Sequence, residues 1–254
     1  MISGLIGMVH LGPLPGSARS VPLDEVIDRA VSDALDLVDA GFDALMIENF
    51  GDAPFFADDV PKATIAAMTR AIAAIAAEIE VPFGVNVLRN DGLGALAVAA
   101  ATGAAFIRIN VLSGSMSTDQ GPIIGRAAEV SRLKAALAPE VAILADVMVK
   151  HAAPPPGLTL EQAAADLWER AGADGIVVSG AGTGQALDRG DLDAVHLAVP
   201  EAPLYAGSGV TDETVAEILT VCAGVIVGTA TKIDGVTTNR VDPMRARAIV
   251  KAAK

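Results

Sequence analysis

The chain has 254 residues, which suits two small domains or one α/β barrel and is enough to bury a large core without disulfides or metals. It carries 31 acidic and 18 basic side chains, and this net charge of −13 argues against a nucleic-acid partner. The single cysteine, Cys222, excludes a disulfide framework and a cysteine-rich zinc site, and it fits a reducing compartment.

A mean hydropathy of +0.49 raises the question of a membrane-spanning segment. The two longest uncharged stretches, Gly92–Ile107 and Ile218–Thr231, are shorter than the roughly 18–20 residues that a spanning helix needs. The apolar N-terminus also lacks the basic region that precedes the apolar run of a signal peptide. We therefore expect a cytoplasmic protein without membrane insertion.

Eight short apolar runs alternate with eight segments of helical periodicity along the whole chain. The runs are continuous, which is typical of parallel strands that are covered by helices. The predicted strands are Leu5–Val9, Ala44–Ile47, Pro82–Leu88, Ala105–Asn110, Val141–Val147, Gly175–Ser179, Pro203–Ala206 and Val225–Val227. The predicted helices are Leu23–Ala40, Pro61–Ile79, Gly92–Thr102, Gly125–Leu137, Leu160–Ala171, Asp191–Val199, Asp212–Thr220 and Pro243–Ala253.

Glycine follows three of these helical segments directly, at Gly41, Gly103 and Gly172, where it can adopt the left-handed conformation that ends a helix. The αβ loops are therefore short, whereas the βα loops are longer and polar. Eight such units without a linker predict a single (β/α)8 barrel over residues 1–254. The alternative is a doubly wound open sheet, but the proline-rich segment His10–Gly16 replaces the glycine-rich turn expected there.

Every predicted strand ends in polar or glycine-rich sequence, and in a barrel these ends form the active-site face. One polar residue at a strand end often has only a capping or solvated role, but eight polar strand ends together predict a binding or catalytic site. The candidate residues are His10, Glu48, Asn86, Arg89, Arg108, Asn110, Asp146, Lys150, His151, Ser179, Thr183, Gly207, Ser208, Gly209, Gly228, Thr229 and Lys232.

The ends of the last two strands predict a phosphate site. Gly207–Gly209 and Gly228–Thr229 allow backbone N–H groups to approach an anion closely, and barrels usually bind phosphate in these two loops. Lys232 lies just beyond and is expected to contribute its charge, and Thr211 is expected to cap the following helix. The alternative is that the glycines only form tight turns.

The middle strands supply the ionisable groups. Arg108 and Asn110 are two residues apart, so both face the barrel mouth, where a buried arginine needs a carboxylate such as Asp146 or Glu48. The arginine and its carboxylate are either catalytic groups or a structural ion pair. Lys150 is the best candidate for proton transfer or a Schiff base, with phosphate or carboxylate binding as the alternative.

His10 and His151 lie at strand ends and are candidate acid/base residues, whereas His196 falls in a predicted helix. With Glu48 and Asp146 the first two could form a divalent metal site. No close His/Cys spacing supports such a site, so we expect no cofactor.

Two βα loops are long enough to cover the site. One is Ser113–Ile124, which contains two glycines, and the other is His151–Thr159, which contains three consecutive prolines. Long loops on a rigid scaffold often control access to an active site. The alternative is that both are ordered surface loops.

The chain resembles the BtpA family, also called BtpA/SgcQ, nearly from end to end. The motifs that carry the resemblance are Met8–Ser17, Ile47–Phe55, Gly84–Asp91, Phe106–Asn110, Asp119–Gly121, Ala145–Ala152, Gly182–Gly184, Gly207–Val210 and Val227–Thr229, with Lys232, Asp234 and Gly235. The resemblance implies a (β/α)8 barrel of the phosphate-binding type. Some members are tied by name to photosystem I biogenesis, and others sit among sugar-uptake and sugar-phosphate genes. Met148 stands where the family pattern has a histidine.

The residues and the resemblance together favour an enzyme that acts on a phosphorylated sugar or nucleoside-derived metabolite as an isomerase, epimerase or lyase. In this hypothesis the acid/base groups are Asp146, Lys150, Glu48, His10 and His151. The substrate is oriented by Asn86, Arg89, Arg108, Asn110, Ser179 and Thr183. The alternatives are a non-catalytic photosystem I assembly factor and a sensor of a phosphorylated metabolite. The composition is also compatible with a homo-oligomer.

Overall fold

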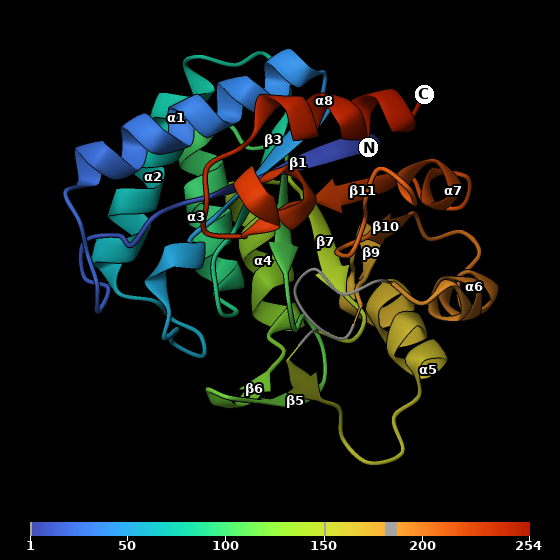
Figure 1. Cartoon of the computed structure of the whole chain (residues 1–254). Coiled ribbons are helices and arrows are strands. Elements are labelled where there is room, and N and C mark those ends of the chain that lie inside the picture. Colours follow the sequence, from blue (N-terminus) through green and yellow to red (C-terminus); the bar gives the residue numbers. More distant parts are fainter. Residues whose placement is uncertain (1, 150, 181–186) are drawn as a thin grey trace.

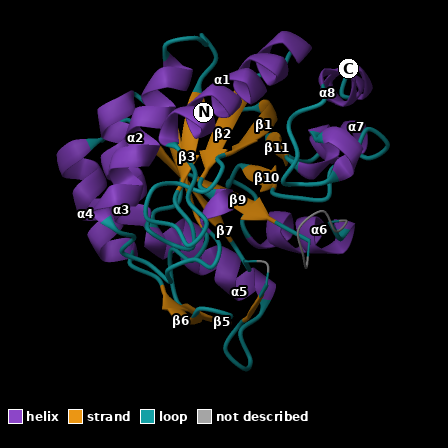
Figure 2. Cartoon of the chain, turned by 60° about the vertical axis from the view of Figure 1, so that its left-hand side comes forward, coloured by secondary structure: helices purple, strands orange, loops and turns teal. Residues whose placement is uncertain are grey.

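A closed barrel of eight parallel strands forms the centre of the molecule, in a computed structural model that describes residues 2–149, 151–180 and 187–254. The strands follow one another around the barrel in the order β1-β2-β3-β4-β7-β9-β10-β11, and β11 pairs with β1. Figure 2 shows the strands gathered at the centre with the helices around them. Of the helices described, not one combines the length and the apolar character that crossing a membrane requires.

The predicted barrel is confirmed, and the doubly wound sheet is excluded. The barrel strands are β1 (Gly4–His10), β2 (Ala44–Glu48), β3 (Phe83–Asn86), β4 (Phe106–Ile109), β7 (Ala142–Asp146), β9 (Gly175–Val178), β10 (Leu204–Ala206) and β11 (Gly224–Val227). The helices are α1 (Leu23–Ala40), α2 (Lys62–Ala76), α3 (Gly92–Thr102), α4 (Ala127–Leu137), α5 (Leu160–Ala165), α6 (Arg189–Ala198), α7 (Val215–Leu219) and α8 (Pro243–Ala252). The predicted helix at α5 continues as a π-helical segment, Asp166–Ala171.

The helix ends follow the sequence signals with one exception. Gly41, Gly103 and Gly172 end α1, α3 and the π-helical segment in the left-handed conformation, with φ of 104°, 77° and 76°. The prediction for Thr211 is wrong, because α7 begins after Thr214. The backbone N–H of Thr211 donates to Oγ1 of Thr214 at 3.0 Å, which forms a turn ahead of the helix.

The barrel interior below the carboxyl ends of the strands is filled by side chains, including the aromatic rings of Phe106 and Tyr205, and has no room for a ligand. Its buried cluster consists of Ile6, Met8, Ala44, Met46, Phe106, Leu144, Val177, Tyr205 and Ile226. Glycines make room for the rings: a Cβ on Gly84 would overlap Phe106, and one on Gly175 would lie 2.6 Å from Tyr205. The Tyr205 hydroxyl donates to the Ile2 carbonyl at 2.6 Å. Space for a ligand therefore remains at the carboxyl ends of the strands.

The two long βα loops contain a small antiparallel sheet that the sequence did not predict. Its strands, in spatial order, are β6 (Gly121–Ile124), β5 (Ser115–Thr118) and β8 (Ala152–Ala153). A separate apolar cluster lies against it and consists of Val111, Met116, Ile123 and Val149. Figure 1 shows β5 and β6 at the lower edge of the molecule. The first loop is thus an ordered hairpin that is paired with the second loop.

Lys232 occupies a different place from the one predicted. Its side chain is fully buried, and its Nζ lies 3.3 Å from Oδ2 of Asp33 in α1. Asp33 also accepts a hydrogen bond from the Val241 N–H at 2.9 Å. Burial lowers the pKa of Lys232, and the charge and hydrogen bond of Asp33 partly oppose this. Lys232 therefore joins α1 to the chain around α8 rather than supplying a charge to a phosphate.

We expect the substitution Lys232→Met to lower the free energy of unfolding by about 3–5 kcal/mol, because Asp33 would be left buried without a counter-charge. Arg70→Met is the control, since the Arg70–Asp24 pair has side chains that are 60% and 76% exposed. The free energy of unfolding of Arg70→Met should fall by under about 1 kcal/mol. Urea unfolding followed by circular dichroism measures both values, and equal losses would contradict this role for the buried pair.

Candidate functional site

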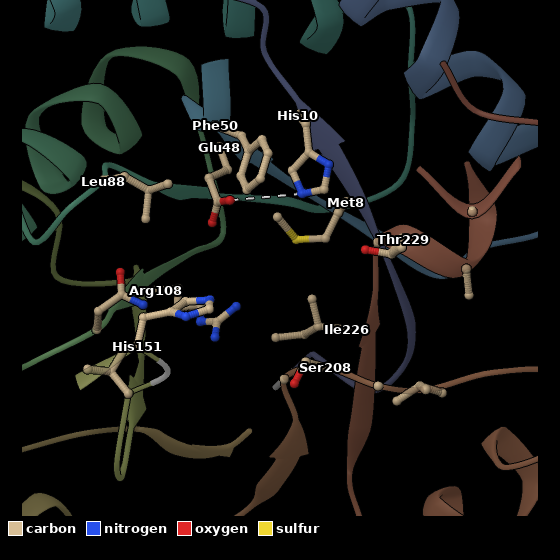
Figure 3. Close-up of a pocket in the computed structure, with 18 of the residues that line it drawn as sticks. Met8, His10, Glu48, Phe50, Leu88, Arg108, His151, Ser208, Ile226 and Thr229 are labelled. Carbon is tan, nitrogen blue, oxygen red and sulfur yellow. Dashed lines mark ion pairs between the residues drawn. The ribbon is translucent and has the colours of Figure 1, made fainter. Parts of the chain in front are cut away.

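A cavity of about 740 Å³ lies at the carboxyl ends of the barrel strands. This volume is in the range of sites that bind small molecules. Met8 and Ile226 from the top of the interior cluster form its apolar floor, and polar side chains and βα loops form its walls. In Figure 3, Glu48 and Arg108 lie on one side of the cavity, and Thr229 lies on the other.

Four polar side chains from consecutive strands lie at one level of the barrel. The strand register pairs His10 with Glu48, Glu48 with Asn86, and Asn86 with Arg108. Residues paired in this way point to the same side of a parallel sheet, so all four side chains point inward. Each is at most 9% exposed, and three of them line the cavity. The strand ends predicted from the sequence therefore form one continuous polar row.

His10 and Glu48 form a candidate proton-transfer pair. Nε2 of His10 lies 3.9 Å from Oε1 of Glu48, and the ring of Phe50 lies 4.7 Å from the imidazole. Figure 3 shows this arrangement, with Phe50 beside the pair. On its other side the imidazole approaches the loop after β11, since a Cβ on Gly228 would lie 3.2 Å from His10 Cε1. The imidazole is thus placed between a carboxylate and the predicted phosphate loop.

Asp146 is an ion-pair partner rather than an exposed acid/base group. Its two oxygens accept hydrogen bonds from Nε and Nη2 of Arg108 at 2.9 and 2.7 Å. The amide of Asn110 and the hydroxyl of Ser179 also donate to it, at 3.0 and 3.2 Å. Its side chain is 0% exposed and is absent from the described cavity lining. Of the two roles left open by the sequence, this geometry favours the structural one.

The charge of Asp146 has a direct effect on Arg108. Burial by itself lowers the pKa of this guanidinium, but the charge and hydrogen bonds of Asp146, helped by Glu48, raise it above the usual value. Arg108 lines the cavity and stays positively charged at any pH that the fold tolerates. It is therefore a fixed positive charge that can stabilise a developing negative charge on a ligand.

Two asparagines in the mouth have polar atoms without protein partners. Both amide atoms of Asn86, which is fully buried, and Oδ1 of Asn110 form no hydrogen bond to the described residues. Buried polar atoms in proteins are nearly always hydrogen-bonded. Of the two, only Asn110 is in the described cavity lining, where a ligand hydroxyl group could donate to its Oδ1.

Two other asparagines tie neighbouring βα loops together. Asn49, after β2, accepts from the Leu88 N–H at 2.7 Å and donates to the Leu88 carbonyl at 3.4 Å. Asn90, after β3, does the same to Val111, with distances of 2.7 and 3.0 Å. Both asparagines are at most 5% exposed. The loops after β2, β3 and β4 are therefore joined by side-chain amides.

Arg89 and His151 also line the cavity, as the sequence predicted. Burial lowers the pKa of Arg89, and the negative charges of Asp146, Glu48 and Asp119 act against this shift. Asp119 lies at the tip of the β5–β6 hairpin and belongs to the lining, although only its motif was noted in the sequence.

Some predicted residues fall outside the cavity or outside the described chain. Met148 packs against the apolar clusters and is absent from the described cavity lining. The predictions for Lys150 and Thr183 concern residues outside the described part of the chain. No three His, Cys, Asp or Glu side chains in the described ranges converge as metal ligands would.

Gly207 and Ser208, from the predicted phosphate loop, have structural contacts of their own. The N–H of Gly207 donates to the Val178 carbonyl at 2.7 Å, and a Cβ there would overlap the hydroxyl of Ser179. The hydroxyl of Ser208 accepts from the Gly180 N–H at 3.1 Å. The glycine thus permits the loops after β9 and β10 to approach each other.

Other backbone groups in these loops are available to an anion. Within the described chain, the N–H groups of Gly209, Thr229 and Ala230 donate to no acceptor, and all three residues line the cavity. Gly209 has a φ of 71°, a conformation that favours glycine. N–H groups that converge from two loops are typical of phosphate sites.

Arg245 is a cavity residue that the sequence analysis missed. It is the third residue of α8, and its Nε donates to the carbonyl of Ala230 at 3.0 Å. Because it lies in a helix rather than at a strand end, no signal in a single sequence marks it as part of the site.

Known proteins match this chain over nearly its whole length. The BtpA family profile matches residues 1–254. The photosystem I biogenesis protein BtpA of Synechocystis is 43% identical over 98% of this chain and 87% of that protein. The putative sgc region protein SgcQ of Escherichia coli is 33% identical over 95% of this chain and 90% of that protein.

Solved structures share the fold at low sequence identity. Phosphoribosyl anthranilate isomerase from Thermus thermophilus aligns with a TM-score of 0.58 and 13% identity, over 98% of this chain and 97% of that one. N-acetylmannosamine-6-phosphate 2-epimerase from Clostridium perfringens aligns with a TM-score of 0.57 and 15% identity, over 89% and 86%. At these identities the likeness supports the barrel fold alone.

We expect Asp146→Asn to destabilise the fold by about 3–5 kcal/mol, because Arg108 would remain buried with its counter-charge removed. Asp119→Asn is the control, since Asp119 lines the same cavity but is exposed, and it should change stability by no more than about 0.5 kcal/mol. Guanidinium chloride unfolding monitored by tryptophan fluorescence compares them. An unchanged midpoint for Asp146→Asn would refute the structural role.

Proposed function

The chain belongs to the BtpA family, and on that premise we propose that it is an enzyme that isomerises, epimerises or cleaves a phosphorylated sugar or nucleoside-derived metabolite. One observation carries the proposal. The candidate proton-transfer pair, His10 and Glu48, and the free N–H groups of two glycine-rich loops line the same cavity. A ligand with a phosphate at one end would place its reacting carbon atoms near the carboxylate and the imidazole.

The proposed chemistry is a proton transfer next to a carbonyl group. Glu48 removes a proton from carbon, and His10 returns a proton to the carbon or oxygen atom that needs one. Arg108 stabilises the negative charge that develops on the carbonyl oxygen, and Asp146 acts only by holding the guanidinium in place. Asn110, which lines the cavity, orients a hydroxyl group of the substrate.

The fold comparisons support the proposal by analogy. The isomerase and the epimerase named above have the same barrel, and the epimerase is named for a sugar phosphate. A shared barrel alone does not establish a shared activity, so the proposal depends on the site itself.

A second candidate function comes from the Synechocystis relative, whose name assigns it to photosystem I biogenesis. On that hypothesis the chain is an assembly factor, and binding of a metabolite is regulatory or absent. A protein that acts only as a scaffold has no need of an inward-facing polar row. We therefore favour the enzyme, and a ligand screen distinguishes the two functions.

Phosphorylated sugars and nucleotides are expected to raise the melting temperature, because a ligand that binds only the folded state stabilises it by about 2.7 kcal/mol at a hundred times its Kd. Their dephosphorylated partners serve as matched controls and should have little effect. Differential scanning fluorimetry measures both sets. Equal shifts from both sets would remove phosphate from the recognition, and no shift at all would favour the assembly factor.

Glu48→Gln should preserve the binding of the compound found in this screen and reduce kcat at least a hundredfold, since the amide cannot take up the proton. Binding by calorimetry and turnover by product analysis are measured on the same preparation. Full turnover by this variant would exclude Glu48 as the base.

A further inference from the structure

An arginine of α8 contacts the loop after β11. Asp242 caps this helix by accepting from the N–H groups of Met244 and Arg245, which fixes its first turn. The Nε–H of Arg245 donates to the carbonyl of Ala230, and this anchors the guanidinium on the loop. Ala230 is also one of the residues whose own N–H is free within the described chain.

The charge of Arg245 is not compensated by a carboxylate. Arg108 is paired with Asp146, and Arg89 lies in the field of Asp146, Glu48 and Asp119. Arg245 forms no ion pair in the described ranges, and Nε supplies the one hydrogen bond that its side chain makes there. Its two terminal nitrogens are therefore available to a ligand in the cavity that it lines.

We propose that Arg245 binds the phosphate group of the ligand together with the backbone N–H groups of Gly209, Thr229 and Ala230. This inference rests on the proposed function and names the side chain that recognises the phosphate. A guanidinium with one edge anchored to protein can still offer the other N–H groups to phosphate oxygens. The positive charge of the phosphate site then comes from α8 rather than from Lys232, which is neutralised by Asp33.

The arrangement favours a terminal phosphate over a carboxylate. A phosphate monoester offers three acceptor oxygens and a charge of about −1.5 to −2 at pH 7. The donors that line the cavity come from two loops and from a helix, so they can supply a hydrogen bond to each of the three oxygens. A planar carboxylate has two oxygens and one charge, so it would leave part of this donor set unused.

Lys232 has an indirect part in this site. Lys232 pairs with Val241 in an isolated bridge, and the N–H of Asp242 donates to the Thr231 carbonyl at 2.8 Å. The buried Lys232–Asp33 pair, which also bonds the Val241 N–H, therefore connects the segment just before α8 to the loop that anchors Arg245. Lys232 is a positioning residue, and Arg245 is the residue that contacts the ligand.

The test compares Arg245→Gln with Arg247→Gln. Arg247 is an exposed arginine on the same helix and is absent from the described cavity lining, so both variants lose one charge from α8. Isothermal titration calorimetry with inorganic phosphate and with ribose 5-phosphate gives the Kd, and ribose is the uncharged control. We expect the Kd of both phosphates to rise about tenfold in Arg245→Gln and to stay unchanged in Arg247→Gln, as the loss of one charge-assisted hydrogen bond predicts.

The melting temperature of each unliganded variant shows whether it is folded, and Arg245→Lys, which retains the charge, should recover part of the affinity. If the wild-type protein binds phosphate and Arg245→Gln binds it equally well, Arg245 is excluded and the proposed function stands. If Arg245→Gln and Arg247→Gln lose affinity equally, the effect is one of overall charge, and the inference is wrong. If the wild-type protein binds neither phosphate, both the inference and the phosphate-dependent function are overturned.

Discussion

A guanidinium inside the mouth of a barrel has to be neutralised there, and Asp146 does this for Arg108. The pair links β4 to β7, and the hydroxyl of Ser179 extends it to β9. A cost of several kcal/mol for an unpaired buried charge makes this contact hard to replace. Both oxygens of Asp146 accept hydrogen bonds from Arg108. The candidate acid/base groups of the polar row are therefore Glu48 and His10.

The cavity has two ends that differ in composition. At one end lie Arg108 and the candidate proton-transfer pair, His10 and Glu48. At the other end, backbone N–H groups of the last two βα loops lie close to Arg245 of α8. The closed order of strands brings the two ends together, since β11 pairs with β1 and places the loop after Gly228 beside His10.

The fold could be predicted from the sequence because its signals are local. Continuous apolar runs and glycines such as Gly41 and Gly103 specify strands and helix ends within a few residues. The strand-end rule also located the cavity-lining residues of the polar row. The strand-end rule could not show that Lys232 forms an ion pair away from the cavity, because its partner Asp33 is 199 residues away in the sequence. The rule also has no means of locating Arg245, which belongs to a helix.

The amides of Asn49 and Asn90 have a further consequence for how the mouth can vary. Each side chain satisfies both the N–H and the C=O of one residue in the next loop, as a neighbouring strand would. The hydrogen-bonded ladder of the barrel is in effect prolonged by side chains beyond the last strand residues. Aspartate has nearly the same shape but lacks the donor, so it would set a carboxylate oxygen against the carbonyl of Leu88 or Val111. Replacing either asparagine with aspartate would therefore weaken the link between two loops and loosen the entrance to the cavity.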